Sequence, residues 1–145
     1  MFYGEYEHAL DPKSRLIIPA KFRDTFKANQ VKTLFVTRGL DGCLFLFPDS
    51  EWRAAEARFK QIPFTKSEGR NFNRMFFSGA AEVEPDALGR ILVPKTLKDY
   101  AKIDEDVVIV GVSTRIEIWA KEHWQEFYEN SRQKFEEMAE RVLLE

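Results

Sequence analysis

The sequence predicts a mainly β protein with flanking α-helices, in which two copies of one small unit close a single shared barrel. The first observation is a duplicated phrase, because LDPKSRLIIPAKFRD at 10–24 is followed 75 residues later by PDALGRILVPKTLKD at 85–99. The second is the local pattern of short branched-apolar runs separated by turn residues, which is typical of strands. The third is size, since a unit of about fifty residues buries too little apolar surface to be stable alone. Two copies that pack together, or that exchange strands around a pseudo-twofold axis, would close one shared barrel.

The duplication extends on both sides of the quoted phrase. Seven identities fall between residues 2 and 24 at an offset of 75, where average composition gives roughly one or two by chance. Farther on, 43–52 matches 115–124 at an offset of 72, so the second copy is three residues shorter. The pattern predicts four segments: repeat 1 at 4–50, a helical connector at 51–78, repeat 2 at 79–122 and a C-terminal helix at 123–145.

Each repeat has the same order of elements. A short strand ends at a proline, which cannot donate to a central ladder, and a brief polar turn follows. A second strand, a tight turn and a third strand come next, and a helix then leaves the repeat. The paired strand segments are 15–19 and 90–94, 33–37 and 106–112, and 43–47 and 115–119.

The segment that joins the repeats is IPFTKSEGRNFNRMFF at 62–77. It has no Gly/Ser tract of the kind that makes a flexible linker. Thr65 to Glu68 fits a helix capping box, and Phe72, Met75 and Phe76 would lie on one apolar side. An ordered helical connector is expected.

The C-terminal segment predicts an amphipathic helix. Apolar and small residues recur there at spacings of four and three, and glutamates occupy most of the remainder. The first half is expected to pack on its own barrel, and the second half on a neighbouring subunit through Phe135, Met138 and Val142. The stripe consists of Trp124, Tyr128, Ser131, Phe135, Met138 and Val142.

Composition excludes several classes of protein. With 44% hydrophobic and 32% charged residues, the chain is an ordinary globular protein. No apolar run approaches the roughly eighteen residues of a membrane span, and the N-terminus lacks the charged and apolar regions of a signal peptide. The single cysteine, Cys43, rules out a disulfide framework and a Cys-rich zinc site. We expect a cytoplasmic protein with no membrane partner.

Enzymatic chemistry has little support in the sequence. None of the common nucleophile, phosphate-binding or dinucleotide-binding motifs occurs. His8 and His123 are far apart, and the spacing of His8 from Glu7 and Asp11 matches no metal-ligand motif. Cys43 lies in an apolar strand and is better explained as a core residue. The prediction is a protein that is not an enzyme and has no cofactor, metal or small-molecule substrate.

Charge is uneven along the chain. Residues 1–75 contain 13 basic and 9 acidic residues, whereas 76–145 contain 9 basic and 15 acidic residues. Basic residues nevertheless gather around both copies of the repeated phrase, at 13–27 and at 90–102. Concentrated basic patches attract phosphate even when the net charge, here −2, is small.

The paired D-x-x-x-R phrases, DPKSR and DALGR, are each followed by an apolar triplet and a proline. In this they resemble the MraZ family of bacterial transcription regulators, which are built from tandem SpoVT/AbrB-like domains. The resemblance covers essentially the whole chain and is closest over MFYGEYEHALDPKSRLIIPAKFR. It implies a swapped-hairpin AbrB-like β-barrel, formed here as an intramolecular pseudo-dimer.

The resemblance also implies a function. Family members bind double-stranded DNA sequence-specifically, at short direct repeats in the promoter of the division and cell-wall gene cluster. They usually act as repressors and assemble into closed homo-oligomeric rings. For this chain it implies binding to its own promoter and association with the nucleoid. Because glutamates make the C-terminal helix acidic, we expect that helix to point away from DNA.

By carry-over of the motif, the DNA-facing candidates are Asp11, Arg15, Asp86 and Arg90, with Lys13 beside the first pair. Arginine can bond guanine bidentately, and an aspartate four residues earlier would orient it. DALGR lacks the central lysine of DPKSR, so the two copies need not contribute equally. The candidate phosphate contacts are Lys13, Lys21, Arg23, Arg38, Lys95 and Lys98.

Two alternatives stay open from sequence. The same small barrel also serves toxin neutralisation, so an antitoxin-like module is possible. The chain could also be a structural ring-former in which each Asp–Arg pair only pins a turn, a surface contact worth about 0–1 kcal/mol.

Overall fold

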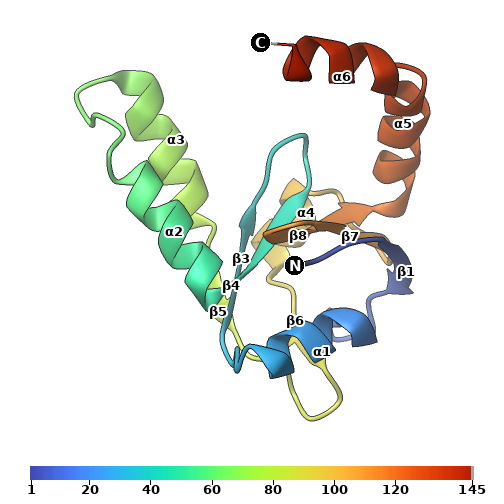
Figure 1. Cartoon of the computed structure of the whole chain (residues 1–145). Helices are drawn as coiled ribbons and strands as arrows, with labels where there is room; N and C mark the ends of the chain where they lie inside the picture. The colour runs from blue at the N-terminus through green and yellow to red at the C-terminus, as the bar shows by residue number, and fades with distance from the viewer. Residues whose placement is uncertain (145) are drawn as a thin grey trace.

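The computed structural model describes residues 1–144, which form eight strands and six helices (Figure 1). The first repeat contains β1 (Glu5–Ala9), β2 (Arg15–Ile17), α1 (Ala20–Ala28), β3 (Leu34–Arg38) and β4 (Leu44–Pro48). The connector contains α2 (Asp49–Phe59) and α3 (Ser67–Ser78). The second repeat contains β5 (Ala81–Val83), β6 (Arg90–Leu92), α4 (Lys95–Tyr100), β7 (Asp106–Val112) and β8 (Arg115–Ala120). The C-terminal segment contains α5 (Lys121–Arg132) and α6 (Phe135–Leu143).

The strand order shows the twofold relation between the repeats. The six-stranded sheet runs β1-β7-β8-β4-β3-β5. The equivalent strands of the two repeats are β1 and β5, β3 and β7, and β4 and β8, and exchanging them gives the same order read from the opposite edge. Strand β1 pairs antiparallel with β7 of the second repeat, and β5 pairs with β3 of the first. Each repeat therefore lends its first strand to the other. The predicted strand-exchanged, mainly β fold is confirmed.

A separate two-stranded ribbon, β2–β6, joins the repeats across the pseudo-twofold axis. Leu16 lies opposite Ile91 at its centre, and both side chains are buried. Beyond the strands, the Ile18 N–H donates to the Gly89 carbonyl and the Val93 N–H donates to the Ser14 carbonyl, each at 2.9 Å. These two equivalent bonds tie each repeat to the turn of the other.

One hydrophobic core is shared by both repeats. Phe22 from α1 and Leu97 from α4 occupy equivalent places in it, and both are almost fully buried. Fully burying one such side chain stabilises the fold by about 1.5–3 kcal/mol. Because each repeat supplies only part of this core, neither repeat would keep it on its own.

The connector is an antiparallel helical hairpin packed beside β3 and β4 (Figure 1). A second cluster, made of aromatic rings, holds it there: Trp52 stacks on Phe35 at 4.9 Å and on Phe76 at 5.5 Å between ring centroids. The predicted capping box is wrong. Helix α3 begins at Ser67 with Lys66 as its N-cap residue and no side-chain cap. Glu68 is then the second helical residue, one position short of the place from which it could reach back.

The C-terminal segment is two helices where the sequence predicts one, with its last residue, Glu145, outside the described residues. Helix α5 packs on β7 and β8, where Trp119 contacts Trp124 and Phe127 at 5.3 and 5.1 Å between ring centroids. Between α5 and α6 the Lys134 N–H donates to the Ser131 carbonyl at 3.0 Å, and the Lys134 backbone leaves the helical conformation, with ψ near 6°. Within residues 1–144, no helix has the length and apolar character that crossing a membrane requires.

Candidate nucleic-acid interface

The two D-x-x-x-R phrases form two equivalent turns that lead into the ribbon strands. In the first turn, Asp11 Oδ1 accepts the backbone N–H groups of Lys13 and Arg15, both at 2.9 Å. The Asp11 N–H in turn donates to the Arg15 carbonyl at 3.0 Å. An aspartate at the start of a tight turn commonly satisfies the backbone in this way. The four-residue spacing is therefore required by the turn itself.

The second turn repeats this geometry. Asp86 Oδ1 accepts the N–H groups of Leu88 at 3.0 Å and Arg90 at 2.9 Å. The residue before each arginine has a left-handed backbone, with φ +62° at Ser14 and +79° at Gly89. Glycine adopts this conformation without a steric cost, whereas serine does so with some strain.

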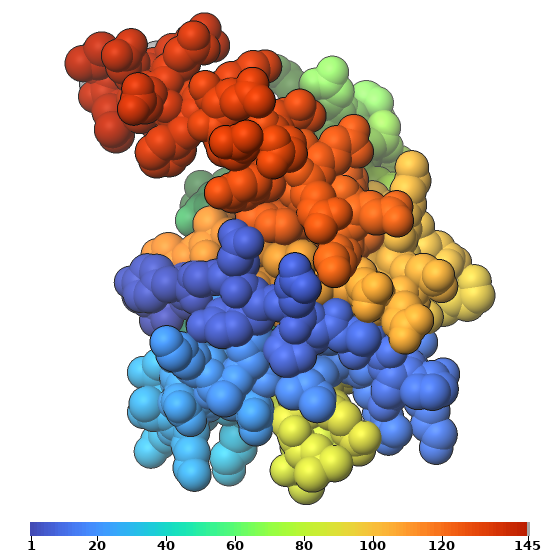
Figure 2. Space-filling view, turned by 90° about the vertical axis from the view of Figure 1, so that its right-hand side faces the viewer, coloured from blue at the N-terminus to red at the C-terminus, as the bar shows by residue number. Residues whose placement is uncertain are grey.

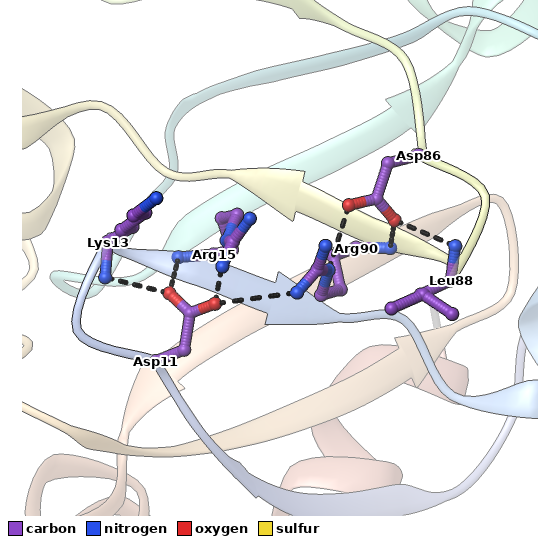
Figure 3. Close-up of polar contacts among 6 residues, drawn as sticks. All are labelled: Asp11, Lys13, Arg15, Asp86, Leu88 and Arg90. Atoms are coloured by element: carbon purple, nitrogen blue, oxygen red, sulfur yellow. Dashed lines mark hydrogen bonds and ion pairs between the residues drawn. The ribbon is translucent and has the colours of Figure 1, made fainter.

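The second oxygen of each carboxylate holds the arginine side chain. Arg15 Nε donates to Asp11 Oδ2 at 2.7 Å, and Arg90 Nε donates to Asp86 Oδ2 at 2.8 Å. Arg90 Nη1 also lies 3.9 Å from Asp11 Oδ2, so the carboxylate of the first repeat faces both guanidinium groups. Figure 3 shows the two arginines side by side between the two aspartates. Among residues 1–144, no hydrogen bond engages the Nη atoms of either arginine.

The backbone N–H of Arg15, more than any other group, lowers the pKa of Asp11 below its ordinary value. The Arg90 N–H does the same for the pKa of Asp86. In each case the arginine side chain and a second N–H of the turn add to the effect. Both carboxylates are therefore charged at neutral pH and keep their hold on the Nε edge of the arginines.

The outer face of the ribbon carries Arg15, Ile17, Arg90 and Leu92, and we call these four residues the ribbon face. Arg15 lies opposite Leu92 and Ile17 opposite Arg90, whereas Leu16 and Ile91 point into the core. A two-stranded antiparallel ribbon is one of the two elements that fit the major groove of B-DNA. The ribbon thus brings together the two predicted arginines, which lie 75 positions apart in the chain.

Two predicted phosphate contacts brace the turns. Lys98 of α4 donates to Ser14 Oγ at 2.8 Å, so the second repeat supports the turn of the first. The equivalent residue of α1, Arg23, donates to the Ile18 carbonyl at 2.9 Å and fills the space that a Cβ at Gly89 would need. Each turn is therefore backed by a basic side chain of the other repeat.

The remaining predicted basic residues have different surroundings. Lys13 and Lys21 are exposed, on the first turn and on α1. Lys95 is exposed and pairs with Asp99 at 2.8 Å. Arg38 instead donates to the Met75 carbonyl at 2.7 Å and to Ser78 Oγ at 3.3 Å, and its guanidinium lies over the Tyr100 ring. Arg38 thus joins β3 to the end of α3, and its guanidinium is already engaged there.

The chain matches the sequence model of the family described as "MraZ protein, putative antitoxin-like" twice, over residues 1–75 and 76–145. The chain belongs to the MraZ family. Each match to the MraZ model contains one D-x-x-x-R turn, and the division between the matches agrees with the offset of 75 in the duplicated phrase.

MraZ relatives share nearly the whole length of the chain. A protein of Pelotomaculum thermopropionicum is 48% identical over 143 residues, which are 99% of this chain and 96% of the relative. A protein of Clostridium beijerinckii is 51% identical over 142 residues, or 98% and 96% of the two chains. One of Lactiplantibacillus plantarum is 47% identical over 143 residues, or 99% of each. All three are named "Transcriptional regulator MraZ", a regulator's name and not an enzyme's, as the sequence predicts.

Sequence reasoning overlooked the exposed aliphatic residues around the two arginines. In the sequence Ile17 and Leu92 indicate only strands, although a strand with one buried face leaves alternate residues outside. Leu88 takes the place in the second turn that Lys13 has in the first, so the missing lysine is also an added aliphatic side chain. The signal was the alternation within RLI and RIL, whose middle residues alone are buried.

Residues 1–144 contain no group of three or more His, Cys, Asp or Glu residues that could hold a metal ion. Cys43 is buried, its thiol donates to the Leu40 carbonyl at 3.1 Å, and burial raises its pKa well above the ordinary value. It is packed as a core residue.

Proposed function

We propose that the chain is a sequence-specific regulator of transcription that binds double-stranded DNA through the ribbon face and the two turns. The observation that carries the proposal is the pair of guanidinium groups, each held by its Nε edge on an aspartate. Their Nη edges remain available for the O6 and N7 atoms of guanine in the major groove. The family and the names of its members support the regulatory role.

The aspartates act as positioning residues. A free arginine side chain loses about 2 kcal/mol of rotamer freedom when it is immobilised. Asp11 and Asp86 restrict Arg15 and Arg90 before DNA arrives, so less of that freedom is lost on binding. Lys13, Lys21 and Lys95 are placed to contact phosphates, which position the protein without choosing a sequence. Arg23 and Lys98 hold the turns and reinforce the positive field.

One chain offers few such contacts, so tight binding requires assembly. Phe135 and Val142 on α6 are 69% and 72% exposed, and Met138 is 40% exposed. We propose that this apolar side of α6 packs on a neighbouring copy and closes a ring. Figure 2 places the C-terminal helices, in red, at the end of the molecule opposite the second turn, in yellow. A ring would then present many turns to short direct repeats and convert weak contacts into avidity.

The proposed target follows from the family. The chain would bind short direct repeats in its own promoter and repress the division and cell-wall gene cluster. It would lie in the cytoplasm, associated with the nucleoid. The two alternatives, an antitoxin-like module and a ring without specific DNA readout, differ from this proposal in what the arginines do.

Fluorescence anisotropy on a labelled fragment from upstream of the gene tests the proposal. The double variant Arg15→Ala/Arg90→Ala is compared with Arg53→Ala/Arg132→Ala. The control pair removes the same charge, and Arg53 makes the same kind of i, i+4 contact with Asp49, at 3.0 Å. Binding that is specific, lost in the first variant and kept in the second supports the proposal. Equal weak binding to native and scrambled fragments by all three proteins would refute it.

Salt dependence and particle mass complete the test. Each phosphate contact contributes about −0.9 to the slope of log affinity against log salt, so Lys13→Ala should flatten the slope by about that amount. A Phe135→Asp/Val142→Asp variant should fall to a smaller mass by light scattering and lose affinity for fragments with several repeats. An unchanged mass would exclude α6 as the assembly surface.

A further inference from the structure

Three aliphatic side chains lie exposed among the basic groups of the candidate interface. Ile17, Leu88 and Leu92 are 43%, 63% and 57% exposed. The first and third belong to the ribbon face, and the second lies at the tip of the second turn. Scattered surface leucines are common in proteins. Three of them beside two guanidinium groups, two on the ribbon strands and one on the second turn, form a defined surface.

The ribbon register places an aliphatic residue against each arginine. Ile17 is the cross-strand neighbour of Arg90, and Leu92 is that of Arg15. Directly opposite residues in an antiparallel pair have Cβ atoms about 4.5–5.5 Å apart. Leu88 is held at its tip by the N–H bond to Asp86, and Figure 3 shows its side chain beside Arg90. Any partner surface that contacts the two arginines would therefore also contact these aliphatic groups.

Charge decides what can cover this surface. Asp11 and Asp86 offset the two arginines, and an excess of positive charge remains from Lys13 and from the two bracing residues, Arg23 and Lys98. The same surface of a second copy would therefore bring like charges together. A nucleic acid supplies the opposite charge. The apolar group that the major groove presents is the C5-methyl of thymine.

We propose that Ile17, Leu88 and Leu92 select thymines next to the guanines read by the two arginines, by packing on their C5-methyl groups. This inference rests on the proposed function and adds the base class that the aliphatic residues recognise. It also gives the two turns different tasks. The first turn, with Lys13 at its tip, reaches a phosphate, whereas the second turn, with Leu88, reaches a base methyl.

Replacing thymine by deoxyuridine tests the inference, because it removes only the methyl group and keeps the base pairs and phosphates. Each thymine of the bound promoter fragment is replaced in turn, and affinities are measured for the wild type, Leu88→Ala and Leu40→Ala. Leu40 is a matched control, being a leucine 61% exposed in the turn between β3 and β4. The wild type and the control should lose about fourfold in affinity at each contacted thymine. Leu88→Ala should bind the thymine fragment about as weakly as the wild type binds the fragment with deoxyuridine at the position that Leu88 contacts. At that position the affinity of Leu88→Ala should not change when thymine is replaced.

Exchanging the two tips sharpens the test. Leu88→Lys should lose the methyl sensitivity at that position and steepen the log–log salt slope by about 0.9. Lys13→Leu should flatten the slope by the same amount and gain sensitivity to a methyl under the first turn.

The outcomes separate the inference from the proposed function. Specific binding that is equally strong with thymine and deoxyuridine at every position overturns the inference and leaves the proposed function intact. No preference for the native fragment overturns the proposed function itself. If Leu88→Ala changes the particle mass and still loses affinity when thymine is replaced by deoxyuridine, Leu88 would contact a neighbouring copy. That result would also overturn the inference.

Discussion

The two turns, 11–15 and 86–90, have the same backbone and different chemistry. Both are closed by an aspartate that accepts two N–H groups and holds an arginine by its Nε edge. They differ at the tip, where Lys13 is replaced by Leu88, and at the left-handed position, where Ser14 is replaced by Gly89. The aspartate and arginine that close each turn are therefore the same in both copies, whereas the tip and the left-handed position, which is occupied once by serine and once by glycine, differ.

The bracing of the two turns differs in the same way. Lys98 makes a hydrogen bond to the Ser14 hydroxyl, whereas Arg23 packs against the bare Gly89. Arg23 opposite Gly89 fills the space that Lys98 and Ser14 fill together in the other repeat. The symmetry of the fold thus fixes the space to be filled and leaves the residue types to vary.

The largest expected effect tests whether the repeats are equivalent beneath the ribbon face. Leu16→Ala and Ile91→Ala should each lower the free energy of unfolding by about 2–5 kcal/mol, because both remove a buried side chain at the centre of the shared core. Urea denaturation of both variants should give single, coincident transitions by fluorescence and circular dichroism. Separate melting of one repeat in either variant would contradict the shared core, and Leu40→Ala serves as the exposed control.

The left-handed position should separate the turns. Gly89→Ala places a Cβ on a backbone with φ +79° and against the Arg23 side chain. We therefore expect the free energy of unfolding, measured by thermal denaturation, to fall by about 1–2 kcal/mol. Ser14→Gly should cost less than this, because it relieves backbone strain at φ +62° while losing the contact to Lys98. Equal losses in the two variants would mean that the turns are not strained as their backbones indicate.

The carboxylates should differ in reach. Asp11 faces both arginines, so Asp11→Asn should disturb the Nε signals of Arg15 and Arg90 in NMR spectra, whereas Asp86→Asn should disturb only that of Arg90. The cost in DNA affinity should be at most about fivefold for each, as for surface ion pairs, and larger for Asp11→Asn. Identical spectra for the two variants would show that the 3.9 Å approach of Arg90 to Asp11 has no effect.

Acid sensitivity follows from the same carboxylates. The folded-state pKa of Asp11 and of Asp86 lies below the unfolded value, so their stabilising effect is complete above about pH 4. It is lost as the pH falls from there through the lower folded-state pKa. Carboxyl titration by NMR should therefore show midpoints for both groups below 3.8. A midpoint above this value for either would mean that the turn does not hold the charged form.

The smallest effect concerns the brace. Ser14→Ala removes the acceptor of Lys98 and should cost about 0.5 kcal/mol, because the bond lies near solvent. Chemical denaturation of Ser14→Ala, of Lys98→Met and of the double variant checks this. If the losses in unfolding free energy of the two single variants add up to that of the double variant, Ser14 and Lys98 do not interact.

Much of the fold and part of the site could be predicted from sequence because the deciding forces are local. The four-residue spacing of Asp and Arg defines a turn whose hydrogen bonds lie within five residues, so it could be recognised in both copies. The branched-apolar runs predict β2, β3, β4, β6, β7 and β8, whereas β1 and β5 carry no such run. The fixed offset indicates two copies of one unit, and the small size of the unit indicates a shared core.

Only the tertiary structure decided which strands pair, how the C-terminal segment divides and which basic residues are engaged. The pairing of β1 with β7 joins segments about a hundred residues apart, and no local pattern specifies that partner. Arg38, Arg23 and Lys98 look alike in sequence, yet one joins β3 to α3 and two brace the opposite turns. The exposure of Ile17 and Leu92 likewise depends on the side from which the core covers the ribbon. Local sequence determines the shape of a turn, whereas contacts between distant residues determine what surrounds it.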